Sequence, residues 1–348
     1  MTFNTTTAIL DGLTTAVFVI DGNRRILLAN TAAADLFGVG LVDQDFVQAV
    51  RHPDCLQSVE DVLGGRDSSA AVISLPLPVP AIYRVSVVGL NPDDETGARA
   101  VISFDDISHV LEAEQMRSDF VANVSHELRS PLTALSGFIE TLKSAAKDDP
   151  AARERFLDIM ERESLRMNRL IDDLLSLSKI EINERVRPAG LVNITTIIEN
   201  VITTLCAQTT EERCAIRLEK PAGIDLIPGD EDELTEVFQN LIDNAIKYGE
   251  PGSEVVVSVR EVGRTFGIQG PALAIDVQDQ GPGIAAEHIP RLTERFYRVD
   301  DSRSRDKGGT GLGLAIVKHI LNRHLGRLQI RSEPGNGSTF TALLPMKL

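Results

Sequence analysis

The spacing of apolar and polar residues divides the chain into three stretches with different patterns. Over the first 110 residues, short apolar runs are separated by turn-forming residues, which indicates a small α/β module. Predicted strands at 16–20 and 25–28 flank Asp21, Gly22 and Asn23, a sequence typical of a tight hairpin turn. We expect helices at 32–37 and 54–63, strands at 83–90 and 100–104, and a loop at 91–97.

Residues 106–181 have the pattern of two helices separated by a break at 147–150. In each half, one set of positions recurs at intervals of three and four, as in a coiled coil. These positions are Val121, Val124, Leu128, Pro131, Leu135, Phe138 and Leu142, then Phe156, Met160, Glu163, Met167, Leu170, Leu174 and Leu177. Because one hairpin leaves this stripe open, we expect two copies to form a dimeric four-helix bundle. Glu163 interrupts the stripe, and Pro131 should kink the first helix because proline has no N–H to donate.

From about residue 190 onwards, helical and strand patterns alternate, and glycines are frequent in the loops. We expect helices at 193–208, 231–248 and 313–324, and strands at 254–262, 273–279, 328–332 and 338–344. The predicted fold class is multidomain α+β, ending in an α/β two-layer sandwich. The expected domains are residues 1–110, 111–185 and 190–348.

The charge of the chain argues against some functions. Its 35 Lys and Arg against 51 Asp and Glu give a formal net charge of −16, whereas nucleic-acid binding requires clustered positive charge. Three cysteines without Cys-x-x-Cys spacing predict idle thiols in a reducing compartment and no structural metal. We find no signal peptide and no apolar run of about 18 residues, so we expect a cytoplasmic protein that meets a membrane only through a membrane-protein partner.

His126 is the first candidate for chemistry. With Val121 and Leu128 at core positions of the heptad, His126 falls on the outward face, and Ser130 follows one turn later. Neutral imidazole is a nucleophile at physiological pH, and Glu127 is placed to accept its proton or to hold its tautomer. A surface histidine without function is the alternative.

The third stretch carries candidate nucleotide ligands. Asn240, Asn244 and Lys247 share one helix face, where amide oxygens suit Mg²⁺ and the ammonium suits phosphate. Asp279 ends a predicted strand before Gly281 and Gly283, so it can accept a hydrogen bond from a nucleobase amine. The alternatives are a solvated polar face and an ordinary turn.

A glycine run precedes the last predicted helix. Gly308, Gly309, Thr310, Gly311 and Gly313 lead into its amino terminus, which favours an anion site. The run lacks the Lys-Ser/Thr of the phosphate loop, and its spacing differs from the dinucleotide fingerprint.

Residues 120–133, around His126, resemble the phosphoacceptor motif of sensor histidine kinases. The resemblance implies that His126 is phosphorylated and that Glu127 assists. Ser130 stands where the family usually has Thr or Asn, the residue that positions a water for dephosphorylating the partner. The hydroxyl is retained, so phosphatase activity is expected.

The third stretch resembles the histidine-kinase ATP-binding domain, a fold shared with gyrase and chaperone ATPases, through its N, G1, F and G2 boxes in the family's order. The implied nucleotide-binding residues are Asn240, Asn244, Lys247, Tyr248, Asp279, Gly281, Gly283, Phe296, Arg298, Gly309, Thr310, Gly311 and Gly313. By this resemblance the two asparagines hold Mg²⁺, the lysine contacts the phosphates of ATP and the aspartate binds adenine. Residues 300–307 would be a mobile lid, whose Arg303, Arg305 and Lys307 either contact phosphate or are merely solvated.

Two further resemblances concern the signal that the protein senses. Residues 288–300, 302–305 and 315–319 are similar to phosphate-regulon sensor kinases, and residues 9–38 and 104–108 resemble a PAS sensory domain. The implied function is ATP-dependent autophosphorylation of a homodimer, followed by phosphotransfer to the receiver-domain aspartate of a response regulator. The alternatives are another ATPase of the same nucleotide fold, which needs no exposed His126, and an ATP-binding scaffold, against which the intact boxes argue.

Overall fold

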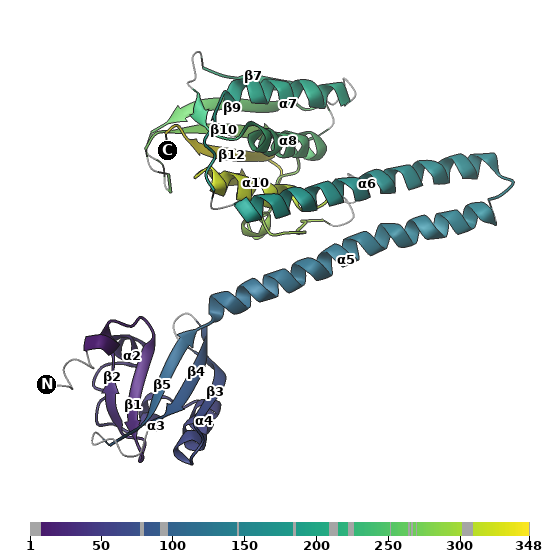
Figure 1. The fold of residues 1–348 in the computed structure, drawn as a ribbon. Helices are drawn as coiled ribbons and strands as arrows, with labels where there is room; N and C mark the ends of the chain where they lie inside the picture. The colour runs from purple at the N-terminus through teal and green to yellow at the C-terminus, as the bar shows by residue number, and fades with distance from the viewer. Residues whose placement is uncertain are drawn as a thin grey trace. The chain divides into compact units, whose positions relative to one another are not determined.

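The computed structural model describes residues 8–76, 80–90, 97–144, 146–183, 186–208, 215–221, 226–250, 252–263, 265, 267–268, 270–300 and 309–347. The chain divides into two compact units, Met1–Ala122 and Asn123–Leu348 (Figure 1). We describe each unit by itself.

The first unit is built on a five-stranded antiparallel sheet in the order β2-β1-β5-β4-β3. Its strands are β1 (Ala16–Asp21), β2 (Ile26–Ala29), β3 (Ser68–Leu75), β4 (Ala81–Gly89) and β5 (Ala98–Asp106), and its helices are α2 (Thr31–Phe37), α3 (Phe46–Ala49) and α4 (Pro53–Leu63). The predicted hairpin is confirmed, because β1 pairs with β2. Sequence analysis missed β3 and α3; in β3 only Ile73 and Leu75 are buried, so its apolar signal is short. Most of the loop expected at 91–97 lies outside the described residues.

The core of this unit is aromatic and aliphatic. Phe18 contacts Phe37, Phe46 and Phe104 with ring centroids 5.4–5.8 Å apart. Buried Asn30 caps α2 and also donates from Nδ2 to the carbonyl oxygens of Leu10 and Thr15, at 2.9 Å each. One polar side chain thus joins the start of α2 to the segment that precedes β1.

The cysteines differ from expectation in one respect. Cys55 is a free buried thiol, and burial raises its pKa to about 12, as expected for an idle cysteine. Cys206, in contrast, is disulfide-bonded, so the expectation of three unpaired thiols is wrong for this residue.

Two long helices form the hairpin. They are α5 (Ser108–Lys143), which passes from the first unit into the second, and α6 (Pro150–Asn183), so the expected break near residues 147–150 is confirmed. The α5 helix continues without interruption through the buried Pro131. None of the described helices is long and apolar enough to cross a membrane.

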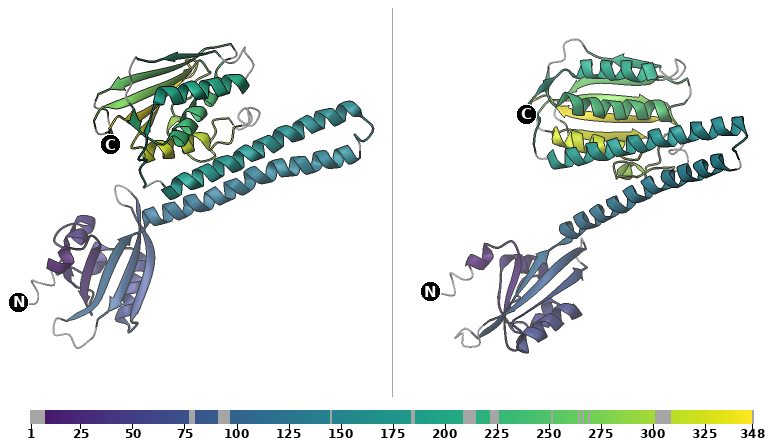
Figure 2. Two further views of the ribbon diagram at one scale, coloured as in Figure 1. Left: turned by 45° about the horizontal axis from the view of Figure 1, so that its top comes forward. Right: turned by 45° about the vertical axis from the view of Figure 1, so that its right-hand side comes forward.

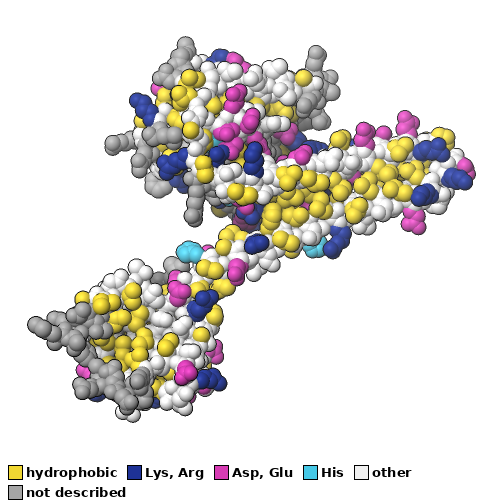
Figure 3. Space-filling model, viewed as in Figure 1, with side chains coloured by type: hydrophobic (Ala, Val, Ile, Leu, Met, Phe, Trp, Pro, Cys, Tyr) yellow, Lys and Arg dark blue, Asp and Glu magenta, His cyan; other side chains and the backbone are white. Residues whose placement is uncertain are grey.

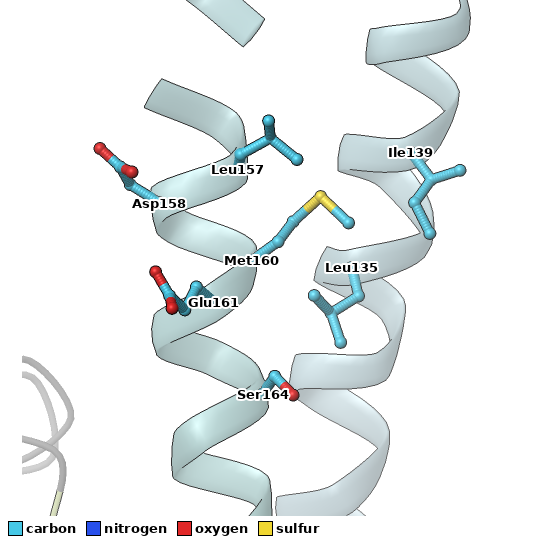
Figure 4. Close-up of a pocket in the computed structure, with 7 residues that line it drawn as sticks. All are labelled: Leu135, Ile139, Leu157, Asp158, Met160, Glu161 and Ser164. Atoms are coloured by element: carbon cyan, nitrogen blue, oxygen red, sulfur yellow. The ribbon is translucent and has the colours of Figure 1, made fainter. Parts of the chain in front are cut away.

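The two helices leave much apolar surface uncovered. The side chains of Leu135 and Ile139 on α5 and of Leu157 and Met160 on α6 line an open groove of about 550 Å³ on the hairpin (Figure 4). Several large hydrophobic side chains of the hairpin are exposed, and Figure 3 shows them gathered along it. They include Leu132, Ile139, Leu157, Leu165, Ile171 and Leu175.

The rest of the second unit is a two-layer α/β domain. Its sheet has the order β11-β12-β10-β9-β7, antiparallel except for the parallel pair β7–β9. The strands are β7 (Ile216–Glu219), β9 (Val255–Val262), β10 (Ala272–Asp279), β11 (Arg327–Ser332) and β12 (Ser338–Pro345), with β6 (Leu191–Val192) and β8 (Ile227–Pro228) forming a separate pair. The helices α7 (Ile194–Gln208), α8 (Glu231–Tyr248) and α10 (Gly313–Arg323) lie against one face of the sheet, and η2 (Ile289–Arg291) is a short turn (Figure 2). Sequence analysis predicted α8 and the four longer strands to within two residues, and it missed β6, β7 and β8.

Local chemistry fixes the start of α8, the helix that carries part of the candidate site. The Asp230 side chain accepts from the Glu233 N–H and caps the helix, and three acidic residues in the first turn complement its positive end. Buried His324, at the end of α10, accepts from the Asp230 N–H at Nε2 (3.0 Å), and its Nδ1 donates to the Ile320 carbonyl (2.8 Å). Because Nε2 must be unprotonated to accept, His324 is neutral, and burial lowers its pKa.

We predict that His324→Ala lowers the free energy of unfolding by about 2–4 kcal/mol, since two buried hydrogen bonds are lost and a cavity forms. Denaturant unfolding at neutral pH measures this, with the exposed Asn322→Ala as the control on the same helix. The pKa of His324 is lower in the folded state, so the unfolded state binds more protons below about pH 6.5 and wild-type stability falls as the pH drops. Equal unfolding free energies of His324→Ala and Asn322→Ala, or an equally steep acid loss without His324, would refute this role.

Candidate functional site

The structure places the candidate phosphoacceptor in the open. His126 and Ser130 are both exposed on α5, one helical turn apart. Their exposure agrees with the outward face that the heptad register predicts, but Val121, a predicted core position, is exposed as well in the single hairpin.

Glu127, next to His126, is held by two arginines. Its Oε2 accepts from Arg166 Nη2 at 2.9 Å and from Arg298 Nη2 at 3.1 Å. Arg166 also pairs with Glu163 at 3.8 Å, which gives the polar interruption of the apolar stripe a partner. Among the described residues, no hydrogen bond joins Glu127 to His126. In this arrangement Glu127 therefore links the hairpin to the two-layer domain.

Arg298 connects Glu127 to the glycine run. Its side chain is only 4% exposed, and besides Glu127 its Nη2 binds the Thr310 carbonyl oxygen at 2.9 Å. The Phe296 N–H donates to the Gly311 carbonyl at 2.8 Å, so a second bond joins the same two segments. Segment 295–298 thus supports the glycine run. Residues 301–308, which include Arg303, Arg305 and Lys307, lie outside the described residues.

The three polar residues predicted on one face of α8 are each half-buried. Asn240 Nδ2 donates to the Glu236 carbonyl at 3.0 Å, which directs Oδ1 towards the start of α10. A Cβ at Gly313 would lie 2.3 Å from this oxygen, so only glycine allows α10 to begin so close to α8. Asn244 lies one turn beyond Asn240, and Lys247 Nζ is 2.5 Å from Asp243 Oδ2. The amide oxygen of Asn240 therefore lies beside the end of the glycine run.

Asp279 ends β10 and is 5% exposed. Its Oδ1 accepts from the Gly281 N–H at 2.8 Å, and burial raises its pKa although this bond and one from Ser338 oppose the rise. A Cβ at Gly281 would lie 2.5 Å from the Tyr248 carbonyl oxygen, so this loop packs against the end of α8. Gly283 follows in the same loop. The carboxylate is thus a fixed acceptor at the end of a central strand.

The carboxy-terminal half of α6 packs against the two-layer domain, a contact that the sequence did not predict. Thr310 Oγ1 donates to Asp173 Oδ2 at 2.5 Å, and Ser176 Oγ donates its one proton to the Glu236 carboxylate, whose two oxygens lie 2.6 and 2.7 Å away. Glu181 forms an ion pair with Arg295. The buried side chains of this part of α6 are Leu170, Leu177 and Ile180.

Burial at this contact raises the pKa of two carboxyl groups, Asp173 and Glu236. Hydrogen bonds from Thr310 and Ser176 oppose the rise without cancelling it. The sequence did not mark Arg166 or Asp173 as site residues, because their partners depend on how the hairpin packs. The only sequence feature near them was the polar Glu163 in the apolar stripe, which pairs with Arg166.

Comparison with known proteins assigns a family to each part. Residues 4–68 match the PAS domain, residues 116–183 the His Kinase A (phospho-acceptor) domain, and residues 229–348 the histidine kinase-, DNA gyrase B- and HSP90-like ATPases.

Relatives match almost the whole chain. The phosphate regulon sensor protein PhoR of Pseudomonas aeruginosa is 35% identical over 330 residues, which cover 94% of this chain and 71% of that protein. The sensor-like histidine kinase SenX3 of Mycolicibacterium smegmatis is 36% identical over 333 residues, covering 94% and 82%. Among solved structures, the histidine kinase ThkA, crystallised with the response regulator protein TrrA, aligns over 97% of this chain and 98% of its own with a TM-score of 0.53 at 20% identity, which shows a shared fold.

A PAS module, a phosphoacceptor hairpin and an ATP-binding two-layer domain in one chain define a signalling phosphotransferase. The chain belongs to the sensor histidine kinases of two-component systems. Its enzymatic class is protein-histidine kinase, and the expectation of an ATP-binding domain is confirmed.

Proposed function

We propose that the chain transfers the γ-phosphoryl group of ATP to His126 and then to the receiver-domain aspartate of a response regulator. One observation carries the proposal. His126 is exposed on α5, while its neighbour Glu127 is joined through Arg298 to Thr310 of the glycine run. Acceptor helix and nucleotide loop are therefore connected inside one compact unit.

The residues present fit a magnesium–nucleotide complex. Asn240 uses its amide nitrogen within α8, which leaves Oδ1 for a hard cation, and Asn244 presents a second amide one turn away. Lys247 and the amino terminus of α10, with Gly309, Gly311 and Gly313, suit phosphate oxygens. Asp279 suits the adenine amine because its carboxylate is buried and oriented by the Gly281 N–H.

Phosphoryl transfer to His126 depends more on the positions of the reacting groups than on an unusually reactive side chain. A bound Mg²⁺ would neutralise charge on the triphosphate. A neutral imidazole nitrogen of His126 attacks the γ-phosphorus in line, an N–P bond forms, and the P–O bond to ADP breaks. The exposed setting of His126 then leaves the phosphoryl group accessible to the attacking aspartate of the partner, which lies on a separate protein.

The hairpin is also the proposed dimer contact. The exposed hydrophobic side chains along α5 and α6 form an apolar surface larger than scattered single residues would give. A second copy of the hairpin covers such a stripe in a four-helix bundle. The similarity to a phosphate regulon sensor protein supports phosphate limitation as the signal.

We predict that His126→Gln abolishes self-phosphorylation and leaves ATP affinity nearly unchanged, since acceptor and nucleotide residues lie on different elements. Labelling with radioactive ATP and calorimetry with a non-hydrolysable analogue measure the two effects. His109→Gln is the matched control, because His109 is also an exposed histidine of α5. Persistent labelling of His126→Gln would show that another residue is the acceptor.

We also predict that Ser130→Ala reduces dephosphorylation of the response regulator by about 5- to 150-fold, the effect of losing one hydrogen bond to a transition state. Self-phosphorylation needs no activated water, so it should stay within a few-fold of wild type. Ser130→Thr restores the family's usual hydroxyl and should keep or raise phosphatase activity. Equal losses of both activities in Ser130→Ala would mean that Ser130 is structural.

A further inference from the structure

The contact between α6 and the ATP-binding domain places a carboxylate at the proposed phosphate site. Asp173 Oδ2 accepts a hydrogen bond from the hydroxyl group of Thr310, with the two oxygens 2.5 Å apart. The ammonium of Lys247 attracts the same carboxylate, as does the guanidinium of Arg169. Lys247 is assigned to the phosphates of ATP, and Thr310 lies in the glycine run that leads into the proposed phosphate site, so Asp173 engages groups that a bound triphosphate would approach.

A carboxylate and a triphosphate cannot both bind the Thr310 hydroxyl and the Lys247 ammonium without a loss of binding free energy. The Thr310 hydroxyl has a single proton, so it donates either to Asp173 or to a phosphate oxygen. Two negative groups around one lysine also repel each other, and burial strengthens the repulsion. Packing of α6 as seen here therefore opposes phosphate binding.

The same contact is poised to open. Burial raises the pKa of Asp173 and of Glu236, which means that both ionised carboxylates would gain hydration on release. Ser176 supplies the hydrogen bond to Glu236 across this contact, and Glu181 of α6 pairs with Arg295. The apolar part of the contact, around Leu177 and Ile180, holds α6 in place against this tendency.

We propose that Asp173 is an internal competitor of the nucleotide phosphates: while α6 packs on the domain, Asp173 engages Thr310, and ATP binds tightly only when this contact opens. The inference rests on the proposed nucleotide site. Because coupling is reciprocal, ATP weakens the packing of α6 by the same factor by which α6 weakens ATP binding.

The coupling reaches the phosphoacceptor through Thr310. Its carbonyl oxygen is bound by Arg298, which also binds Glu127 beside His126. Opening of the Asp173–Thr310 contact thus changes the surroundings of the arginine that holds Glu127. A signal that rotates or shifts α6 would alter nucleotide loading and the setting of His126 together.

Calorimetry on the full chain tests the proposal with three probes: a non-hydrolysable ATP analogue, ADP and adenosine. Asp173→Asn keeps an acceptor for Thr310 but removes the charge, so it should bind the ATP analogue roughly 5- to 50-fold more tightly than wild type, ADP with a smaller gain, and adenosine unchanged. Asp172→Asn, the same change at the exposed neighbouring position, should match wild type with all three probes.

Ser176→Ala provides a second variant outside the nucleotide site. It leaves the Glu236 carboxylate without its donor and weakens the packing of α6, so it should also tighten binding of the ATP analogue but not of adenosine. If Asp173→Asn fails to fold, as judged by circular dichroism, this variant decides the question.

The outcomes separate the inference from the proposed site. Identical affinities of wild type and Asp173→Asn for the ATP analogue, or an equal gain with adenosine, would overturn the competition while leaving the nucleotide site intact. A wild-type chain that binds neither the ATP analogue nor adenosine would overturn the site, and the competition with it.

Discussion

Thr310 is bonded at two atoms to the helical hairpin, directly through Asp173 and indirectly through Arg298. Its hydroxyl donates to Asp173 on α6, and its carbonyl accepts from Arg298, whose guanidinium also binds Glu127 on α5. The position of the glycine run relative to His126 therefore depends on two carboxylates of the hairpin. Any movement of α5 against α6 must change at least one of these bonds, which makes Thr310 the natural point of connection between a sensory input and the nucleotide.

Burial has different consequences for the three carboxyl groups whose pKa it raises in this unit. Asp279 is bonded to backbone N–H groups of its own domain, so its position does not depend on the hairpin. Asp173 and Glu236 are half-buried where α6 packs on the domain, and each is bonded to a hydroxyl across that contact. The first arrangement suits constant recognition of a base, whereas the second suits a contact that opens and closes.

Much of the fold was predictable from the sequence because its signals are local. The cap at Asp230 and the apolar stripe of α8 mark that helix from end to end, and the turn at residues 21–23 marks the first hairpin. The strands that sequence analysis missed are short or only partly buried, such as β6 and β3, so their apolar patterns are weak.

The site was predictable in part, for the same reason. Motif spacing identified residues such as Asn240, Gly313 and Asp279, and the structure places Asn240 against Gly313. Motif spacing could not identify Asp173 as the partner of Thr310, or Arg166 as a partner of Glu127. Those pairs join residues 137 and 39 positions apart, and they depend on the packing of the hairpin rather than on any repeat in the sequence.

The central claim is that His126 carries a phosphoryl group taken from ATP. The most direct test is to incubate the purified chain with γ-labelled ATP and Mg²⁺, then treat the labelled protein with acid and, separately, with base. A phosphoryl group on an imidazole nitrogen is lost in acid and kept in base, so the label should behave in this way and map to the peptide that contains His126. A label that survives acid, or one that maps elsewhere, would contradict the account.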